Sequence, residues 1–242
     1  MKKIISAILC MCILFNIPLS SYAANPLVFR DEPIRSFEES IKLEQTEKII
    51  EDYCNNISNS RTVTYYKELS ITPILQQESF YCAAATTHLL LKHINGYADP
   101  QSSIASSLGC TVNSGPSTSE IKGYINARIS GSTYDNPHLS NGATQLRNAV
   151  QYSVDKGRPV ICQLKTGTLP GYSSQKNTNH YVLAIGARNG FSSTDSVDNI
   201  IYIDTYDTTT NNVRSYGRHE IATSELTTAI ENHYLGYIVR SN

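Results

Sequence analysis

The chain is organised around one stretch, Gln76-Gln-Glu-Ser-Phe-Tyr-Cys82-Ala-Ala-Ala, which runs directly into the apolar segment Thr86-Thr-His-Leu-Leu-Leu-Lys92. This segment stops at Asn95-Gly96, and glycine is the usual left-handed residue just past a helix end. Three successive leucines leave little of the segment for solvent, which is typical of a central, buried helix. The sequence therefore predicts a thiol in the first turn of a buried helix.

A thiol in that position has a chemical use. The start of a helix carries partial positive charge, which favours the nucleophilic thiolate of Cys82. The side-chain amide of Gln76, together with the Cys82 backbone N–H, could stabilise the oxyanion of a tetrahedral intermediate, with Gln77 as the second candidate. The simpler interpretation is that Cys82 is a small buried core residue and that Ser79 caps the helix.

The N-terminus has the pattern of a secretory signal peptide. Lys2-Lys3 precedes an apolar run over residues 4–19, and small residues follow up to Ala24. We expect cleavage after Ala23, so residues 1–23 are the signal peptide and the protein is secreted to the extracellular side. An uncleaved anchor is the alternative. Because the sequence has no second long apolar segment, no stable membrane span is expected after cleavage.

Roughly 220 residues then remain, enough for one sizeable domain. Residues 24–68 differ from the rest: Ser36 and Glu39 form a capping-box pattern that opens an amphipathic helix to about Tyr53. They are either an N-terminal helical extension or a pro-segment, and residues 69–242 form the main domain. The net charge is −1 and the basic residues are scattered, so no nucleic-acid partner is expected.

Four cysteines remain after signal removal: Cys54, Cys82, Cys110 and Cys162. A nucleophilic Cys82 must stay unpaired, which allows at most one disulfide. Cys162 lies in an apolar run that predicts a buried strand, so Cys54 with Cys110 is the preferred pair. The sequence has no Cys-x-x-Cys and no paired histidine spacing, and we expect no metal and no organic cofactor.

The remaining pattern places helices first and strands second. Helices are predicted over residues 99–108, 117–129, 141 or 144 to 156, and 220–231, and strands over residues 159–164, 180–185, 200–203 and 235–239. This order is typical of an α+β fold. The polar loop over residues 165–179 is long for a connection between strands, and such loops often form lids or binding walls.

A catalytic thiol needs a base, and the base needs an acceptor that orients it. His180 begins the most apolar predicted strand and Asp204 ends the next one, so antiparallel pairing would bring the two together. The simpler interpretations are a sheet-edge histidine and a carboxylate that caps a turn. We interpret His88 and His93, on the Cys82 helix, as packing or surface residues, and His138 as an exposed loop residue.

The order of these residues resembles a known family. A glutamine six residues before the cysteine, then Gly157-Arg-Pro-Val-Ile161, His180-Tyr-Val-Leu-Ala-Ile-Gly186 and Tyr202-Ile-Asp204, are similar to the motifs of papain-like cysteine peptidases. The match is best with the bacterial branch related to the double-glycine leader peptidases of bacteriocin exporters. The resemblance runs from about Leu69 to the C-terminus.

This resemblance implies a papain-like fold in which a helical first half packs its nucleophile helix on a late antiparallel sheet. It also implies a role for each motif residue: Cys82 is the nucleophile, His180 the general base, Asp204 the orienting carboxylate and Gln76 the oxyanion donor. The family usually has glycine after the cysteine and proline after the aspartate, whereas this chain has Ala83 and Thr205. The second difference leaves Asp207 as a rival to Asp204.

The expected function is that of a secreted thiol hydrolase that cleaves an external peptide or protein. The exporter-linked relatives are fused to membrane and ATP-binding regions that this chain does not contain, so leader removal coupled to transport is not implied. Because the same three residues serve any acyl transfer, a cell-wall peptide amidase is an alternative. A papain-like binding or toxin module without turnover is a further alternative.

Overall fold

The structure is a computed structural model that describes residues 27–60, 65–131, 133–173, 177–189 and 198–242. The predicted signal peptide, residues 1–23, lies outside the described residues. Within the described ranges, no helix is both long enough and apolar enough to cross a membrane.

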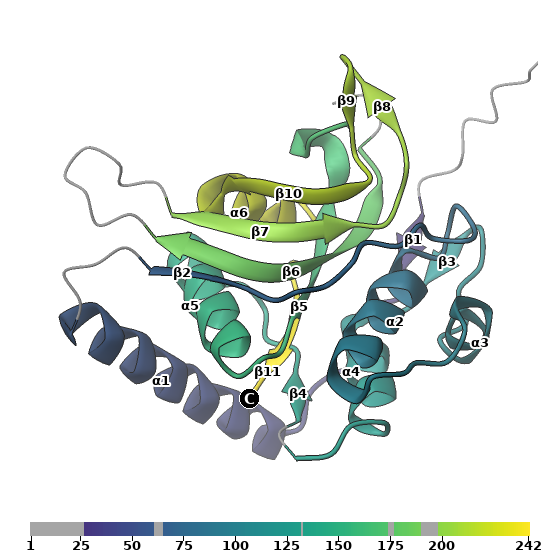
Figure 1. The fold of residues 1–242 in the computed structure, drawn as a ribbon. Helices are drawn as coiled ribbons and strands as arrows, with labels where there is room; N and C mark the ends of the chain where they lie inside the picture. Colours follow the sequence, from purple (N-terminus) through teal and green to yellow (C-terminus); the bar gives the residue numbers. More distant parts are fainter. Residues whose placement is uncertain (1–26, 61–64, 132, 174–176, 190–197) are drawn as a thin grey trace, which may run out of the picture.

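A seven-stranded sheet forms the centre of the fold (Figure 1). Its strand order is β10-β7-β6-β5-β11-β4, and β2 pairs with the far half of the long strand β6. All of these pairings are antiparallel. The strands are β2 (Tyr65–Glu68), β4 (Tyr134–Asp135), β5 (Val160–Lys165), β6 (Asn179–Asn189), β7 (Asn199–Asp204), β10 (Gly217–Ala222) and β11 (Ile238–Ser241).

Helices lie on both sides of this sheet. They are α1 (Phe37–Ser60), α2 (Cys82–Asn95), α3 (Gln101–Ser107), α4 (Thr118–Asn126), α5 (Gly142–Asp155) and α6 (Thr223–Glu231), with a short 3-10 helix η1 (Thr166–Thr168). In Figure 1, α2, α3 and α4 group at one end of the sheet, while α1 runs alongside α5 at the other. The prediction of an α+β fold with the Cys82 helix packed on a late antiparallel sheet is confirmed.

Two small strand pairs complete the fold. β1 (Val28–Phe29) pairs in parallel with β3 (Ser114–Gly115). β8 (Thr209–Thr210) and β9 (Val213–Arg214) form a hairpin that projects beyond the end of β7 (Figure 1). The hairpin matters for function because it follows Asp204 directly in the chain.

Helix α2 begins at Cys82 and ends at Asn95, followed by Gly96 with a left-handed φ of 77°, so the predicted bounds are confirmed. Tyr81 precedes the helix and provides no side-chain cap, so the interpretation of Ser79 as the cap is wrong. The Ser117–Glu120 capping box of α4 is confirmed, with both reciprocal hydrogen bonds present.

The predicted helix of residues 220–231 is only partly correct, because its first residues form the edge strand β10 before α6 begins at Thr223. Polar side chains such as Arg218 and Glu220 are common on an edge strand, where one side of the strand faces solvent. Pairing with β7 therefore overrides the local helical pattern.

The N-terminal segment is built into the domain. Phe29 is buried to 1% exposure and stacks on Tyr181 with ring centroids 4.4 Å apart. The Glu32 carboxylate accepts hydrogen bonds from the backbone N–H groups of Thr118 and Ser119, at 2.6 and 3.1 Å, and so caps α4. Helix α1 extends seven residues beyond the predicted Tyr53 end.

The preferred Cys54–Cys110 disulfide is wrong for this structure, in which neither described cysteine forms one. The Cys54 thiol instead contacts the backbone carbonyl of Asn148 on α5 at 3.7 Å. Cys110 packs at the edge of the main core, which is a separate cluster from the one that holds Cys54.

Candidate active site

Cys82 is the first residue of α2 and is only 2% exposed. A helix start presents backbone N–H groups without intrahelical acceptors. Since Tyr81 supplies no side-chain cap, these N–H groups face the region of the thiol without competition from a capping side chain. Cys82 therefore occupies the helix-start position that the sequence predicted.

His180 and Asp204 meet as the strand arrangement predicted. β6 and β7 are antiparallel neighbours, and Leu183 pairs with Ile203. The Nε2 atom of His180 lies 2.8 Å from Oδ1 of Asp204, and the two side chains are 6% and 1% exposed. A buried contact of this length between an imidazole and a carboxylate fixes the orientation of the ring.

Cys82 is close enough to the same imidazole to raise the pKa of His180. Because Nε2 is engaged by Asp204, the second ring nitrogen, Nδ1, is left for the thiol. The structure therefore brings together thiol, imidazole and carboxylate from α2, β6 and β7. Three segments far apart in the sequence supply them.

The charges around His180 favour its protonated form. Burial by itself lowers the pKa of His180, but the Asp204 carboxylate and the nearby Cys82 more than offset this, and the pKa rises to about 10. The raised pKa favours the imidazolium form of the ring at neutral pH. Such an arrangement is suited to a thiolate–imidazolium pair.

Asp204 accepts two further hydrogen bonds. The Tyr206 backbone N–H donates to Oδ1 at 2.9 Å, and the Tyr172 hydroxyl donates to Oδ2 at 3.0 Å. Both carboxylate oxygens of this buried group are thus paired. Sequence reasoning missed Tyr172, although the unusual length of the loop over residues 165–179 pointed to a wall of the site.

The rival carboxylate, Asp207, lies in a different environment. It is exposed and forms a two-point ion pair with Arg214, with both N–O distances 2.6 Å. Hydrogen bonding from Arg214 holds the pKa of Asp207 below its ordinary value. The geometry brings Asp204, and not Asp207, to His180.

Gln76 lies next to the residue that follows Asp204. Its backbone N–H donates to the Thr205 carbonyl at 2.8 Å, and its Oε1 accepts from the Thr205 hydroxyl at 3.3 Å. Its Nε2 donates to the Glu78 carbonyl at 2.8 Å, which uses one of the two N–H bonds of the amide. Gln77, by contrast, is exposed and its backbone bonds to Gln101 on α3.

The other singled-out histidines lie elsewhere. His88 and His93 bond to the backbone carbonyls of Asp99 and Gly157, at 2.8 and 3.1 Å. His138 is exposed and packs edge-on against Tyr237. Across the part of the chain that the structure describes, no group of three or more His, Cys, Asp or Glu side chains is placed to hold a metal ion.

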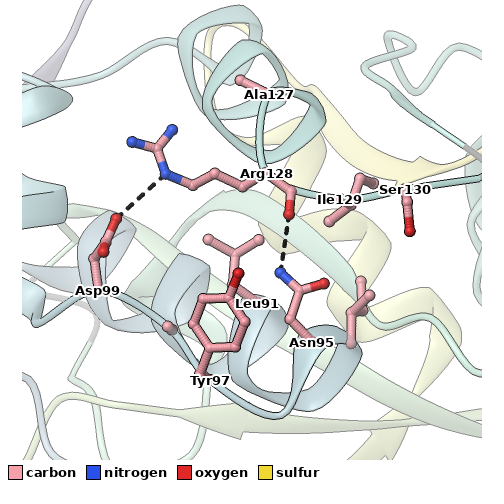
Figure 2. A pocket seen from close by; sticks show the side chains of 10 residues that line it. Leu91, Asn95, Tyr97, Asp99, Ala127, Arg128, Ile129 and Ser130 are labelled. Atoms are coloured by element: carbon pink, nitrogen blue, oxygen red, sulfur yellow. Dashed lines mark hydrogen bonds and ion pairs between the residues drawn. The ribbon is translucent and has the colours of Figure 1, made fainter.

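A surface hollow of about 720 Å³ lies at the far end of α2 (Figure 2). Asn95 on the last turn of α2 donates to the Arg128 carbonyl at 3.0 Å, and the Arg128 side chain pairs with Asp99 at 3.3 Å. An α-helix rises 1.5 Å per residue, so Asn95 is about 20 Å from Cys82 along the axis. This hollow is separate from the candidate active site.

A buried thiol, imidazole and carboxylate are the groups that a cysteine peptidase requires. The model of the Peptidase_C39 like family matches residues 68–230. The chain belongs to this family, as the sequence motifs predicted.

Among solved structures, the chain is similar to a double glycine motif protease from an AMS/PCAT transporter, solved in complex with the leader peptide. The two share 13% sequence identity, the match covers 72% of this chain and 93% of the other, and the TM-score is 0.46. No curated protein matches the chain significantly. The family assignment rests on the family match.

Proposed function

We propose that Cys82, His180 and Asp204 act together to hydrolyse peptide bonds. The observation that carries this proposal is the buried 2.8 Å contact between His180 and Asp204, with Cys82 close enough to the same imidazole to raise its pKa. The Cys82 sulfur attacks the scissile carbonyl carbon, and His180 donates its proton to the leaving amine. A water molecule, deprotonated by His180, then attacks the thioester and releases Cys82. Asp204 holds the ring in place through both steps.

The proposed oxyanion donors are the Cys82 backbone N–H and the side-chain amide of Gln76. The Cys82 N–H lies at the start of α2, where it has no intrahelical acceptor. Gln76 is held beside the site by two hydrogen bonds to Thr205, and one N–H of its amide remains for the substrate oxygen. Donors of this type stabilise the charge that develops in the tetrahedral intermediate.

Selective labelling tests the nucleophile. Burial raises the pKa of the other thiols, to about 11 for Cys54 and about 12 for Cys110 and Cys162, so these thiols are protonated at neutral pH. Iodoacetamide at pH 7 should therefore label Cys82 first, as read by mass spectrometry of the digested protein. Labelling spread evenly over the four cysteines would contradict the assignment.

The proposed substrate is a peptide or protein outside the cell, because the pattern of residues 1–23 is typical of an export signal. A peptide-library assay that compares the exported chain with Cys82→Ala tests this. Cleavage of library peptides by the unmodified chain alone supports a peptidase. Release of fragments from peptidoglycan without peptide cleavage would identify a cell-wall amidase, and a biological effect unchanged in Cys82→Ala would identify a binding module.

We further propose that residues 27–60 are a permanent part of the domain and not a removable pro-segment. Phe29 lies in the main hydrophobic core, and Glu32 caps α4. Glu47 on α1 lies 2.9 Å from the fully buried guanidinium of Arg240. A chain that begins at Thr62 should therefore lose its cooperative thermal unfolding. If it folds and gains activity, the segment is a pro-segment.

A further inference from the structure

Tyr172 contacts both partners of the buried His180–Asp204 pair. Its hydroxyl lies 3.0 Å from Asp204 Oδ2 and 3.4 Å from His180 Nε2. The hydroxyl donates its single proton to the carboxylate, because an ionised carboxylate is the stronger acceptor. The Tyr206 N–H holds the other carboxylate oxygen, Oδ1, at 2.9 Å. Each oxygen of Asp204 thus has its own donor besides the imidazole.

We infer that Tyr172 is a positioning residue whose hydroxyl holds Asp204 in the orientation that presents Oδ1 to His180. The inference rests on the proposed function of the Cys82, His180 and Asp204 group. A carboxylate can rotate about the bond to its methylene carbon, and each anchored oxygen reduces this freedom. Tyr172 does not take part in the steps that make or break bonds, and it affects them only by orienting Asp204.

Aromatic contacts keep the Tyr172 ring over the pair. Its ring stacks on Tyr206, with centroids 6.4 Å apart and an angle of 18° between the planes, and lies 5.9 Å from the His180 ring. The Tyr206 ring approaches the same imidazole edge-on at 6.4 Å. Two tyrosines therefore surround the imidazole–carboxylate contact with apolar surface, which strengthens it by reducing access of water.

The backbone around Tyr172 is also held closely. Gly171 has a φ of 81°, and a Cβ atom at this residue would lie 2.3 Å from the backbone nitrogen of Ser215. Only glycine fits there, because the left-handed conformation and the close approach both exclude a side chain. The Ser215 hydroxyl donates to the Tyr206 carbonyl at 2.7 Å, so the two tyrosines are supported by the same neighbour.

The test combines Tyr172→Phe with a matched control. Tyr172→Phe removes the hydroxyl and keeps the ring in the stack. Tyr216→Phe is the control, because it removes a hydroxyl that donates to the Pro73 carbonyl at 3.0 Å and that makes no hydrogen bond to Asp204 or His180 among the described contacts. The best-cleaved library peptide serves as substrate, and kcat and KM are measured separately.

We expect Tyr172→Phe to lower kcat about 10-fold with KM changed less than about 2-fold, since Tyr172 acts on the orientation of Asp204 and not on substrate binding. Tyr216→Phe should keep both values within about 2-fold. In an Asp204→Ala background, adding Tyr172→Phe should lower kcat less than about 2-fold, because two residues that act through one contact are not additive.

Three results would overturn the inference: kcat of Tyr172→Phe within 2-fold of the unmodified chain, an equal loss in Tyr216→Phe, or a full 10-fold loss that persists in the Asp204→Ala background. Failure of the proposed function gives a different result. In that case Cys82→Ala retains hydrolysis, or Asp204→Ala is as active as the unmodified chain, whatever Tyr172→Phe does.

Discussion

The two sides of the candidate active site are held by different means. The thiol side consists of Cys82 at the start of α2, where the backbone of the helix itself provides the electropositive environment. The imidazole side consists of His180 and Asp204 on β6 and β7, where the Tyr172 hydroxyl from the loop before β6 and one backbone N–H from the segment after β7 complete the contacts. One side depends on secondary structure and the other on a hydrogen-bond network.

This difference has a consequence for mutations. A helix start persists when a single neighbouring side chain changes, because its N–H groups belong to the backbone. A buried network loses much of its function when one partner is removed, because the remaining polar atoms are left unpaired. We therefore expect the thiol side to respond only to replacement of Cys82 and of the proposed oxyanion donor Gln76, and the imidazole side to respond to substitutions throughout its hydrogen-bond network.

The largest effect is expected for Cys82→Ala, which removes the nucleophile. Peptide hydrolysis should fall by more than about 10³-fold, because the variant lacks the sulfur that attacks the scissile carbonyl. The assay is cleavage of the best library peptide, with circular dichroism to confirm that the variant folds. If activity stays within 10-fold of the unmodified chain, Cys82 is not the nucleophile.

Asp204→Asn should lower kcat by about 10²-fold or more. The amide keeps the shape of the side chain but removes the negative charge that raises the pKa of His180, so the pKa of His180 should fall. Titration of labelled histidine by NMR measures this directly. An unchanged histidine titration would contradict the role given to the carboxylate, even if kcat fell.

Gln76→Ala should lower kcat by about 10- to 10²-fold, since it removes one of two proposed oxyanion donors and leaves the Cys82 N–H in place. Gln77→Ala is the matched control, because Gln77 is exposed and makes only a backbone contact to Gln101. The kinetic assay with the same peptide compares the two variants. Equal losses of kcat in both variants would show that Gln76 is not an oxyanion donor.

The protonation of His180 also predicts a pH dependence of stability. Its folded-state pKa, about 10, is raised above the ordinary value of 6.5, so the fold binds this proton more tightly than the unfolded chain does. The resulting stabilisation is fully present below pH 6.5 and is lost as the pH rises toward 10. In thermal melts, the Tm difference between the unmodified chain and His180→Gln should therefore shrink from pH 6 to pH 9.5. A constant difference would indicate a neutral imidazole.

The smallest effect is expected for Asp207→Asn, which should keep kcat and KM within about 2-fold. Asp207 is exposed and its carboxylate is paired with Arg214 instead of with the His180 imidazole. Comparing this variant with Asp204→Asn tests which of the two aspartates orients His180: the one buried in the hydrogen-bond network or its exposed neighbour in the sequence. A loss as large as that of Asp204→Asn would reverse the assignment.

Much of the fold could be predicted because its signals are local. The bounds of α2 follow from an apolar run that ends at Gly96, and the start of α4 follows from the Ser117–Glu120 capping box. The strand β10 could not be predicted in this way. The sequence predicts residues 220–222 as the start of a helix, whereas hydrogen bonding to β7 makes them the end of this strand.

Short-range patterns in the sequence identify the residues that are chemically equipped for the site and give their order along the chain. Cys82 at a helix start, His180 at the beginning of one strand and Asp204 at the end of the next follow from short-range patterns, since helix and strand periodicities extend over only a few residues. Motif order along the chain also predicted the peptidase family.

Tertiary structure alone decided which of two nearby carboxylates meets the imidazole and which loop residue supports it. Asp204 and Asp207 are only three residues apart, yet the first is fully buried against His180 and the second is exposed against Arg214. Tyr172 reaches Asp204 from 32 residues away in the chain. Contacts of this kind depend on how distant segments pack, and no local pattern encodes them.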